Sequence, residues 1–117
     1  MRIDYLSTIL KTNMDIVVLT VLASTIVVFG GIAVYLAEHH HEGANITKIG
    51  DALWWAVVTV ATVGYGDYYP VTTVGQIITV FMMLSGIGTF VLLVGSLSQR
   101  RLQRTESRLK RKLKPEY

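Results

Sequence analysis

The sequence predicts an all-α membrane protein with two membrane-spanning helices and a short apolar helix between them. Three observations carry this prediction. Residues 16–37 and 71–99 contain no charged side chain, and the short segment 52–61 between them is also apolar. Hydrophobic residues make up 51% of the 117 residues and charged residues only 16%, below the roughly 25% that is usual in soluble domains. Most of the surface is therefore expected to lie outside water.

The two charge-free segments have the length that a bilayer requires. Residues 16–37 form a helix of roughly 33 Å, and the apolar part of the second segment, residues 74–97, forms one of roughly 36 Å. Because a bilayer core is about 30 Å thick, both can cross it with some tilt. The first segment is longer than the apolar part of a signal peptide, about 7–15 residues. We therefore expect it to be a retained span.

Basic residues are concentrated on one side of the predicted spans. Eight of the eleven Lys and Arg residues lie between residues 100 and 114, whereas the region between the spans has four acidic residues and Lys48 alone. The positive-inside rule places the basic tail, residues 100–117, in the cytoplasm. Two spans bring residues 1–15 to the same side, as a short interfacial helix or a frayed start. We expect a multi-pass protein of the cell membrane with both termini cytoplasmic.

The region between the spans is not an ordinary loop. A polar stretch, residues 38–50, is followed by the apolar segment 52–61, which makes a helix of roughly 15 Å, half of a bilayer. This length favours a re-entrant or buried helix over a span. Asp51 stands at its start as a candidate N-cap, and its charge suits the positive end of a helix.

A glycine-containing segment, residues 62–67 with the sequence TVGYGD, follows this short helix. Non-helical backbone at membrane depth is tolerated only where it is buried in protein or lines a water-filled path. The two glycines predict positive φ at alternate positions, and alternating handedness turns successive carbonyls toward one side. Four such strands around an axis form rings of oxygen that can replace the water shell of a cation. Because one strand cannot surround an ion, we expect a homotetramer.

The sequence TVGYG resembles the selectivity filter of the potassium channel family. The resemblance begins at residues 51–55, DALWW, runs through the filter to Pro70 and continues more loosely along the second span, and it looks most like archaeal and bacterial channels. It implies a pore subunit that conducts K⁺ passively, has three further copies of itself as partners and is not an enzyme. The K⁺-binding filter implied by the resemblance comprises Thr62, Val63, Gly64, Tyr65 and Gly66, of which the first four supply carbonyl oxygens.

The resemblance also implies a support behind the filter. Asp67 should accept a hydrogen bond from the indole of Trp54, and the Tyr65 ring should pack against Trp54 and Trp55. Interfacial anchoring is the alternative role for the two tryptophans. Some members of the family carry a glutamate at the position of Val58, paired with the aspartate after the filter. Val58 cannot form that pair, so any inactivation that depends on it is left open.

The second span carries the residues expected to control opening. By resemblance Gly86 occupies the hinge position of the inner helix, and Gly88 is the second candidate. Close helix packing is the alternative role for such glycines. Four large apolar side chains on one side of the lower helix either close the pore by dewetting or face lipid: Phe90, Leu93, Val94 and Leu97. No ladder of arginines lies within the spans, so a usual voltage sensor is not expected.

The tail and the polar stretch leave several interpretations open. Three roles are open for the tail: a short four-helix bundle, binding of anionic lipid headgroups, or a positive-inside anchor, which we favour. Nucleic acid is not expected as a partner. A regulatory domain of a longer protein is left open. The three histidines at 39–41 favour a solvated turret over a metal site. Residues 45–47 fit the N-glycosylation pattern, which matters only in a eukaryotic secretory context.

The predicted organisation has three parts. These are an N-terminal segment, 1–15; a pore domain, 16–99, divided into outer helix 16–37, turret 38–50, pore helix 51–61, filter 62–67 and inner helix 71–99; and a basic tail, 100–117.

Overall fold

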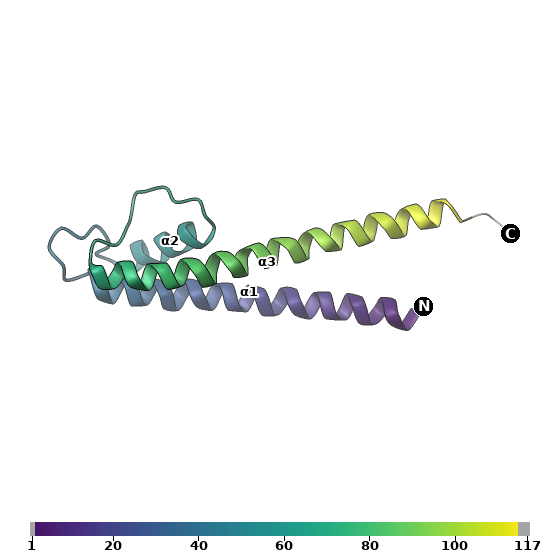
Figure 1. Cartoon of the computed structure of the whole chain (residues 1–117), viewed down its shortest axis with the longest axis horizontal. Coiled ribbons are helices and arrows are strands. Elements are labelled where there is room, and N and C mark those ends of the chain that lie inside the picture. The colour runs from purple at the N-terminus through teal and green to yellow at the C-terminus, as the bar shows by residue number, and fades with distance from the viewer. Residues whose placement is uncertain (1, 115–117) are drawn as a thin grey trace.

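The computed structural model describes residues 2–114 and folds them into three α-helices (Figure 1). These are α1 (Arg2–Glu38), α2 (Ile49–Val60) and α3 (Thr73–Lys112). The long helices α1 and α3 lie side by side, and the short α2 lies beside them at the end away from the two termini (Figure 1). Residues 2–114 contain no strand. The predicted all-α class, with two long apolar helices and a short helix between them, is confirmed.

Both long helices continue beyond the predicted spans. Helix α1 has 37 residues and α3 has 40, roughly 55 and 60 Å at about 1.5 Å per residue. Each is long and apolar enough to cross a membrane. Helix α1 runs back to Arg2, so residues 2–15 are not a separate helix, and α3 runs on through the basic tail to Lys112.

The starts of α2 and α3 differ from the predicted ones. Asp51 is not the N-cap of α2: Lys48 occupies that position with extended backbone and no side-chain cap, and Asp51 lies in the first turn. Its charge still suits the positive helix end there. Helix α3 begins at Thr73 rather than at residue 71 because Thr72 is its N-cap, with the Gly75 N–H donating to Thr72 Oγ1 at 3.0 Å.

The core lies where all three helices meet. Its buried members come from α1, the turret, α2 and α3: Val34, Ile46, Ala52, Trp55, Ala56, Val60 and Met82. Ile46 of the turret is fully buried in this core, which fixes the middle of the turret. Glycine allows the helices to approach closely, since a Cβ on Gly31 would lie 3.3 Å from the carbonyl oxygen of Ala52. This core forms the base from which the filter segment extends.

Candidate functional site

The inner end of the filter segment is tied to the last turn of α2. The N–H groups of Val63 and Gly64 both donate to the carbonyl oxygen of Val58, at 3.0 and 3.2 Å, and the Thr62 N–H donates to the Thr59 carbonyl at 3.0 Å. The Val58 side chain is buried, so this position supports the segment through its carbonyl while its side chain fills the core.

The backbone of the filter segment alternates in handedness. Gly64 has φ 55° and Gly66 has φ 79°, which confirms the positive φ expected at the two glycines. Thr62 also has positive φ, 62°, and is the one non-glycine residue in the described part of the chain that does. A left-handed conformation costs such a residue roughly 1–2 kcal/mol. The hydrogen bonds to the end of α2 hold Thr62 in it, so positive φ recurs at every second residue.

Asp67 forms the outer end of the segment and is bonded to α2. The indole N–H of Trp54 donates to Asp67 Oδ2 at 2.9 Å, as the resemblance implied, and the Tyr68 N–H donates to Asp67 Oδ1 at 3.1 Å. The Tyr65 ring stacks on the Trp54 ring, with centroids 6.0 Å apart and planes 6° apart. Trp55 is instead buried in the core. Within one chain, the ring support of Tyr65 is therefore Trp54.

Glu38 is a site residue that the sequence analysis used only as the start of the turret. Its side chain is fully buried at the end of α1. The carboxylate accepts the N–H of Val71 and the N–H of Thr72, both at 2.9 Å, and the Thr72 hydroxyl at 2.6 Å. The sequence signal that could have identified Glu38 is its position directly after a charge-free span. A carboxylate buried at that position must be supplied with hydrogen-bond donors by other parts of the chain. Glu38 joins the outer end of α1 to the start of α3.

Asn45 is the second residue that the sequence analysis did not place at the site. Its side-chain amide donates to the Asp67 carbonyl at 3.2 Å and accepts the Tyr69 N–H at 3.2 Å. Both bonds reach across more than twenty residues, one to the outer end of the filter segment and one to the loop after it. The glycosylation-like pattern at 45–47 was the only signal attached to this position, and it pointed to a different role.

The two candidate hinge glycines have different surroundings. Gly86 is buried, and a Cβ on it would lie 2.7 Å from Val60 Cγ2 of α2. A Cβ on Gly88 would have no atom within 4 Å. Helix α3 continues through both positions without a break. The contact with α2 thus distinguishes Gly86 from Gly88.

The four apolar side chains predicted at the lower inner helix do not share one environment. Phe90 packs against the core, and with Leu93 it lines an open apolar pocket of about 440 Å³ beside Val60. Val94 and Leu97 are exposed. A single chain therefore leaves the part of this surface formed by Val94 and Leu97 uncovered.

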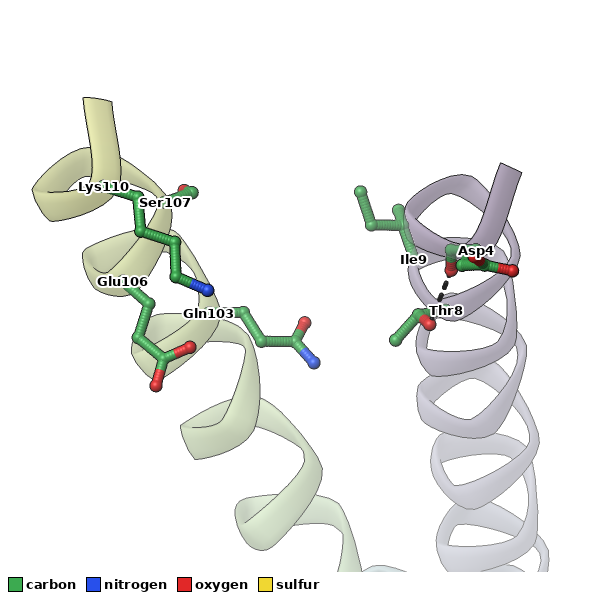
Figure 2. A pocket seen from close by; sticks show the side chains of 7 residues that line it. All are labelled: Asp4, Thr8, Ile9, Gln103, Glu106, Ser107 and Lys110. Carbon is green, nitrogen blue, oxygen red and sulfur yellow. Dashed lines mark hydrogen bonds between the residues drawn. The ribbon is translucent and has the colours of Figure 1, made fainter. Parts of the chain in front are cut away.

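A second open pocket lies far from these residues. It has a volume of about 480 Å³ and lies between the two long helices near the termini. Figure 2 shows side chains of α1 and α3 reaching toward it from opposite sides. It is lined by Asp4, Thr8, Ile9, Gln103, Glu106, Ser107 and Lys110. No residue predicted for the filter, its support or the hinge lies there.

Comparison with known proteins agrees with this arrangement. The model of a family described as ion channel matches residues 16–102. A voltage-gated potassium channel of Aeropyrum pernix is 46% identical over 72 residues, which are 62% of this chain and 24% of that protein. A cyclic nucleotide-gated potassium channel of Rhizobium etli is 42% identical over 74 residues, 62% of this chain and 21% of that protein.

A human relative covers less of both chains. Potassium voltage-gated channel subfamily A member 5 of Homo sapiens is 47% identical over 60 residues, 51% of this chain and 10% of that protein. The chain thus spans between 10% and 24% of the length of these three relatives. The matched family covers most of this chain, including α2, the filter segment and the apolar part of α3. The chain therefore belongs to the ion channel family, as a membrane-embedded pore unit of the two-helix potassium channel type and not as an enzyme.

Proposed function

We propose that four copies of this chain form a pore that conducts K⁺ passively and selectively, with Thr62, Val63, Gly64, Tyr65 and Gly66 as its filter. The observation that carries the proposal is the alternation of positive φ at Thr62, Gly64 and Gly66. Such alternation turns successive carbonyl groups of one strand toward a common side. Four strands then present rings of carbonyl oxygens, which replace the hydration shell of K⁺.

Exposure of the filter segment supports assembly into a tetramer. In the single chain Val63 is 53% exposed and Tyr65 is 66% exposed. Non-helical backbone at membrane depth must be buried in protein or line a water-filled path. Three neighbouring copies satisfy this requirement, since they cover the outward side chains and leave the carbonyls facing a shared axis. The C-terminal end of α2 then contributes partial negative charge beneath the filter.

The opposite end of the pore is proposed as the gate. Both termini lie in the cytoplasm, where the basic residues of the tail favour the anionic membrane surface. Movement of α3 about Gly86 opens and closes the pore, with Gly88 as the second candidate hinge. The contact between Gly86 and Val60 of α2 supports the first position, because it couples α3 to the helix that ends at the filter.

The test is K⁺ and Na⁺ flux through the purified protein in liposomes, with a matched pair of glycine variants. Gly66 (φ 79°) and Gly43 (φ 87°) both have positive φ, and neither has an atom within 4 Å of an added Cβ. Alanine costs roughly 1–2 kcal/mol of backbone strain at either position, but only Gly66 belongs to the filter.

We expect the wild-type protein and Gly43→Ala to pass K⁺ and not Na⁺, and Gly66→Ala to lose selectivity or conduction. Selective K⁺ flux through Gly66→Ala would contradict the assignment of the filter. Equal loss of flux in both variants would attribute the effect to backbone strain rather than to the filter.

A further inference from the structure

The middle of the turret is held in place and faces the loop after the filter. Ile46 is fully buried in the core, and a turn precedes it, in which the Ala44 N–H donates to the His41 carbonyl at 3.1 Å. Asn45 lies between this turn and the buried Ile46. Its backbone position is therefore determined from both sides, which allows a short side chain to act at a defined place.

The Asn45 amide is used at both of its polar atoms. Nδ2 donates to the Asp67 carbonyl oxygen and Oδ1 accepts the Tyr69 N–H, each at 3.2 Å. The two partners lie on either side of Tyr68 in one short stretch of backbone. Asparagine offers a donor and an acceptor on two separate atoms of one planar group. An aspartate carboxylate has no donor, and a serine hydroxyl has its donor and acceptor on a single atom. The amide nitrogen is also the atom that N-glycosylation would modify, and here it is already engaged.

Apart from Asn45, the described residues that bond to Asp67 are Trp54 of α2 and the adjacent Tyr68. The Asp67 carboxylate accepts from the Trp54 indole and the Tyr68 N–H, while its carbonyl oxygen is held by Asn45. Gly66, directly before it, has φ 79° and no atom within 4 Å of an added Cβ. Among residues 2–114, no side chain forms a hydrogen bond with the peptide between Gly66 and Asp67, so its orientation depends on the bonds that Asp67 makes to Asn45, Trp54 and Tyr68.

We propose that Asn45 is a positioning residue that holds the outer end of the filter in its conducting form, acting through the backbone of Asp67 and Tyr69. The inference rests on the proposed function, since it assumes that residues 62–66 conduct ions. Loss of the amide frees the Asp67 carbonyl and the Tyr69 N–H together. The outer filter then leaves the conducting form more often, while the ion preference set by the carbonyl rings is unchanged.

The test is single-channel recording of the full chain in planar bilayers. Asn45→Ala removes both bonds, and Asn45→Asp keeps the acceptor for Tyr69 and removes the donor to Asp67. The matched control is Thr47→Ala, an exposed position in the same loop that also breaks the glycosylation-like pattern. We expect Asn45→Ala to shorten the conducting periods about fivefold to thirtyfold, the effect of two lost neutral hydrogen bonds. Thr47→Ala should behave like the wild type.

The dependence on K⁺ separates positioning from general damage to the fold. An ion bound in the ordered filter stabilises that form by mass action. Raising K⁺ on the turret side should therefore lengthen the conducting periods of Asn45→Ala toward the wild-type value, with an unchanged reversal potential. Conducting periods equal to wild type in Asn45→Ala, or a shortening that K⁺ does not relieve, would overturn the inference.

Hydrogen exchange of the wild-type protein provides a second test that needs neither a folded variant nor conduction. The Tyr69 amide should exchange more slowly than the amide of His40, an exposed turret residue, because the Tyr69 N–H donates to Asn45. Equal exchange at the two amides would overturn the inference even if Asn45→Ala does not assemble. A wild-type channel without K⁺ selectivity would instead refute the proposed function, and the exchange result would still decide whether the Asn45 bond exists.

Discussion

The two ends of the molecule are held together by different kinds of interaction. At the end that contains α2, side-chain hydrogen bonds join distant parts of the chain, such as those of Glu38 with Thr72 and of Trp54 with Asp67. Toward the termini, the side-chain hydrogen bonds that the structure describes run three or four residues back along the same helix, as from Thr20 to Ile16 and from Ser98 to Val94.

Burial follows the same division. Among the residues that the structure describes, those classed as buried all lie between Gly31 and Thr89. Large apolar side chains elsewhere on α1 and α3 are bare, including Val21 at 61% exposed and Leu92 at 62%. The difference teaches that a single chain contains its own scaffold for the filter segment. The rest of each long helix must be covered by lipid or by other copies.

The difference between the α2 end and the terminal end of the molecule is tested most strongly at Glu38. Glu38→Ala removes the shared acceptor of three donors on Val71 and Thr72, and we expect the free energy of unfolding to fall by about 3 kcal/mol or more per chain. Thermal unfolding of the purified protein in detergent measures this. Glu106→Ala on exposed α3 is the matched control and should leave the unfolding temperature unchanged. Equal effects at the two ends would break the comparison.

Two neighbouring glycines test whether the contrast between packed and uncovered positions also holds within α3. Gly86→Ala places a Cβ 2.7 Å from Val60 Cγ2, and such overpacking costs about 1–3 kcal/mol. Gly88→Ala meets no atom and should be neutral or stabilising, since alanine favours a helix by about 1 kcal/mol over glycine. Bilayer recordings should show a shifted open probability and unchanged ion preference for Gly86→Ala alone. A changed ion preference with unchanged gating would contradict the hinge role.

Trp54→Phe separates the two contributions of Trp54 to the filter. The variant loses the hydrogen bond to Asp67 and keeps a ring beside Tyr65. We therefore expect the conducting form of the filter to be destabilised by about 1 kcal/mol. The measurement is the length of the conducting periods in bilayers, which should shorten without a change in reversal potential. Trp54→Ala loses the ring as well and should have the larger effect. If Trp54→Phe matched wild type, the ring stack alone would support Tyr65.

The smallest expected effect is at Tyr68. A hydrogen bond to Asp51, with the nearby charges of Asp51 and Asp67, raises the pKa of Tyr68 above its ordinary value of about 10. The neutral phenol is therefore favoured in the fold. Its contribution is fully present below pH 10 and is lost as the pH rises through the raised pKa. Thermal unfolding of wild type and Tyr68→Phe should differ slightly at pH 8 and converge toward pH 11. A difference that is constant with pH would contradict this account.

The helices and the alternating backbone were predictable because they follow from local sequence. Charge-free runs, an apolar segment of half-bilayer length and two glycines at alternate positions each leave a pattern in the chain. The full length of α3 was not predicted, because the basic tail ends the apolar pattern without ending the helix. Arginine, lysine, glutamine and glutamate are good helix formers, and no glycine or proline occurs between residues 96 and 114.

The contacts of Glu38 and Asn45 were not predictable from local pattern. Each bonds to backbone groups more than twenty residues away, so neither periodicity nor spacing connects the partners. The positive φ of Thr62 was missed for a related reason. It is imposed on a non-glycine residue by bonds to the end of α2. Support of the filter is thus set by loop-to-loop geometry that appears only once the chain is folded.

The most direct test of the central claim is the reversal potential of the purified protein in a planar bilayer with K⁺ on one side and Na⁺ on the other. We predict a reversal close to the K⁺ equilibrium potential, because four alternating strands present carbonyl rings that replace the K⁺ hydration shell. A reversal near zero would contradict the account, since it would mean that the pore does not distinguish K⁺ from Na⁺.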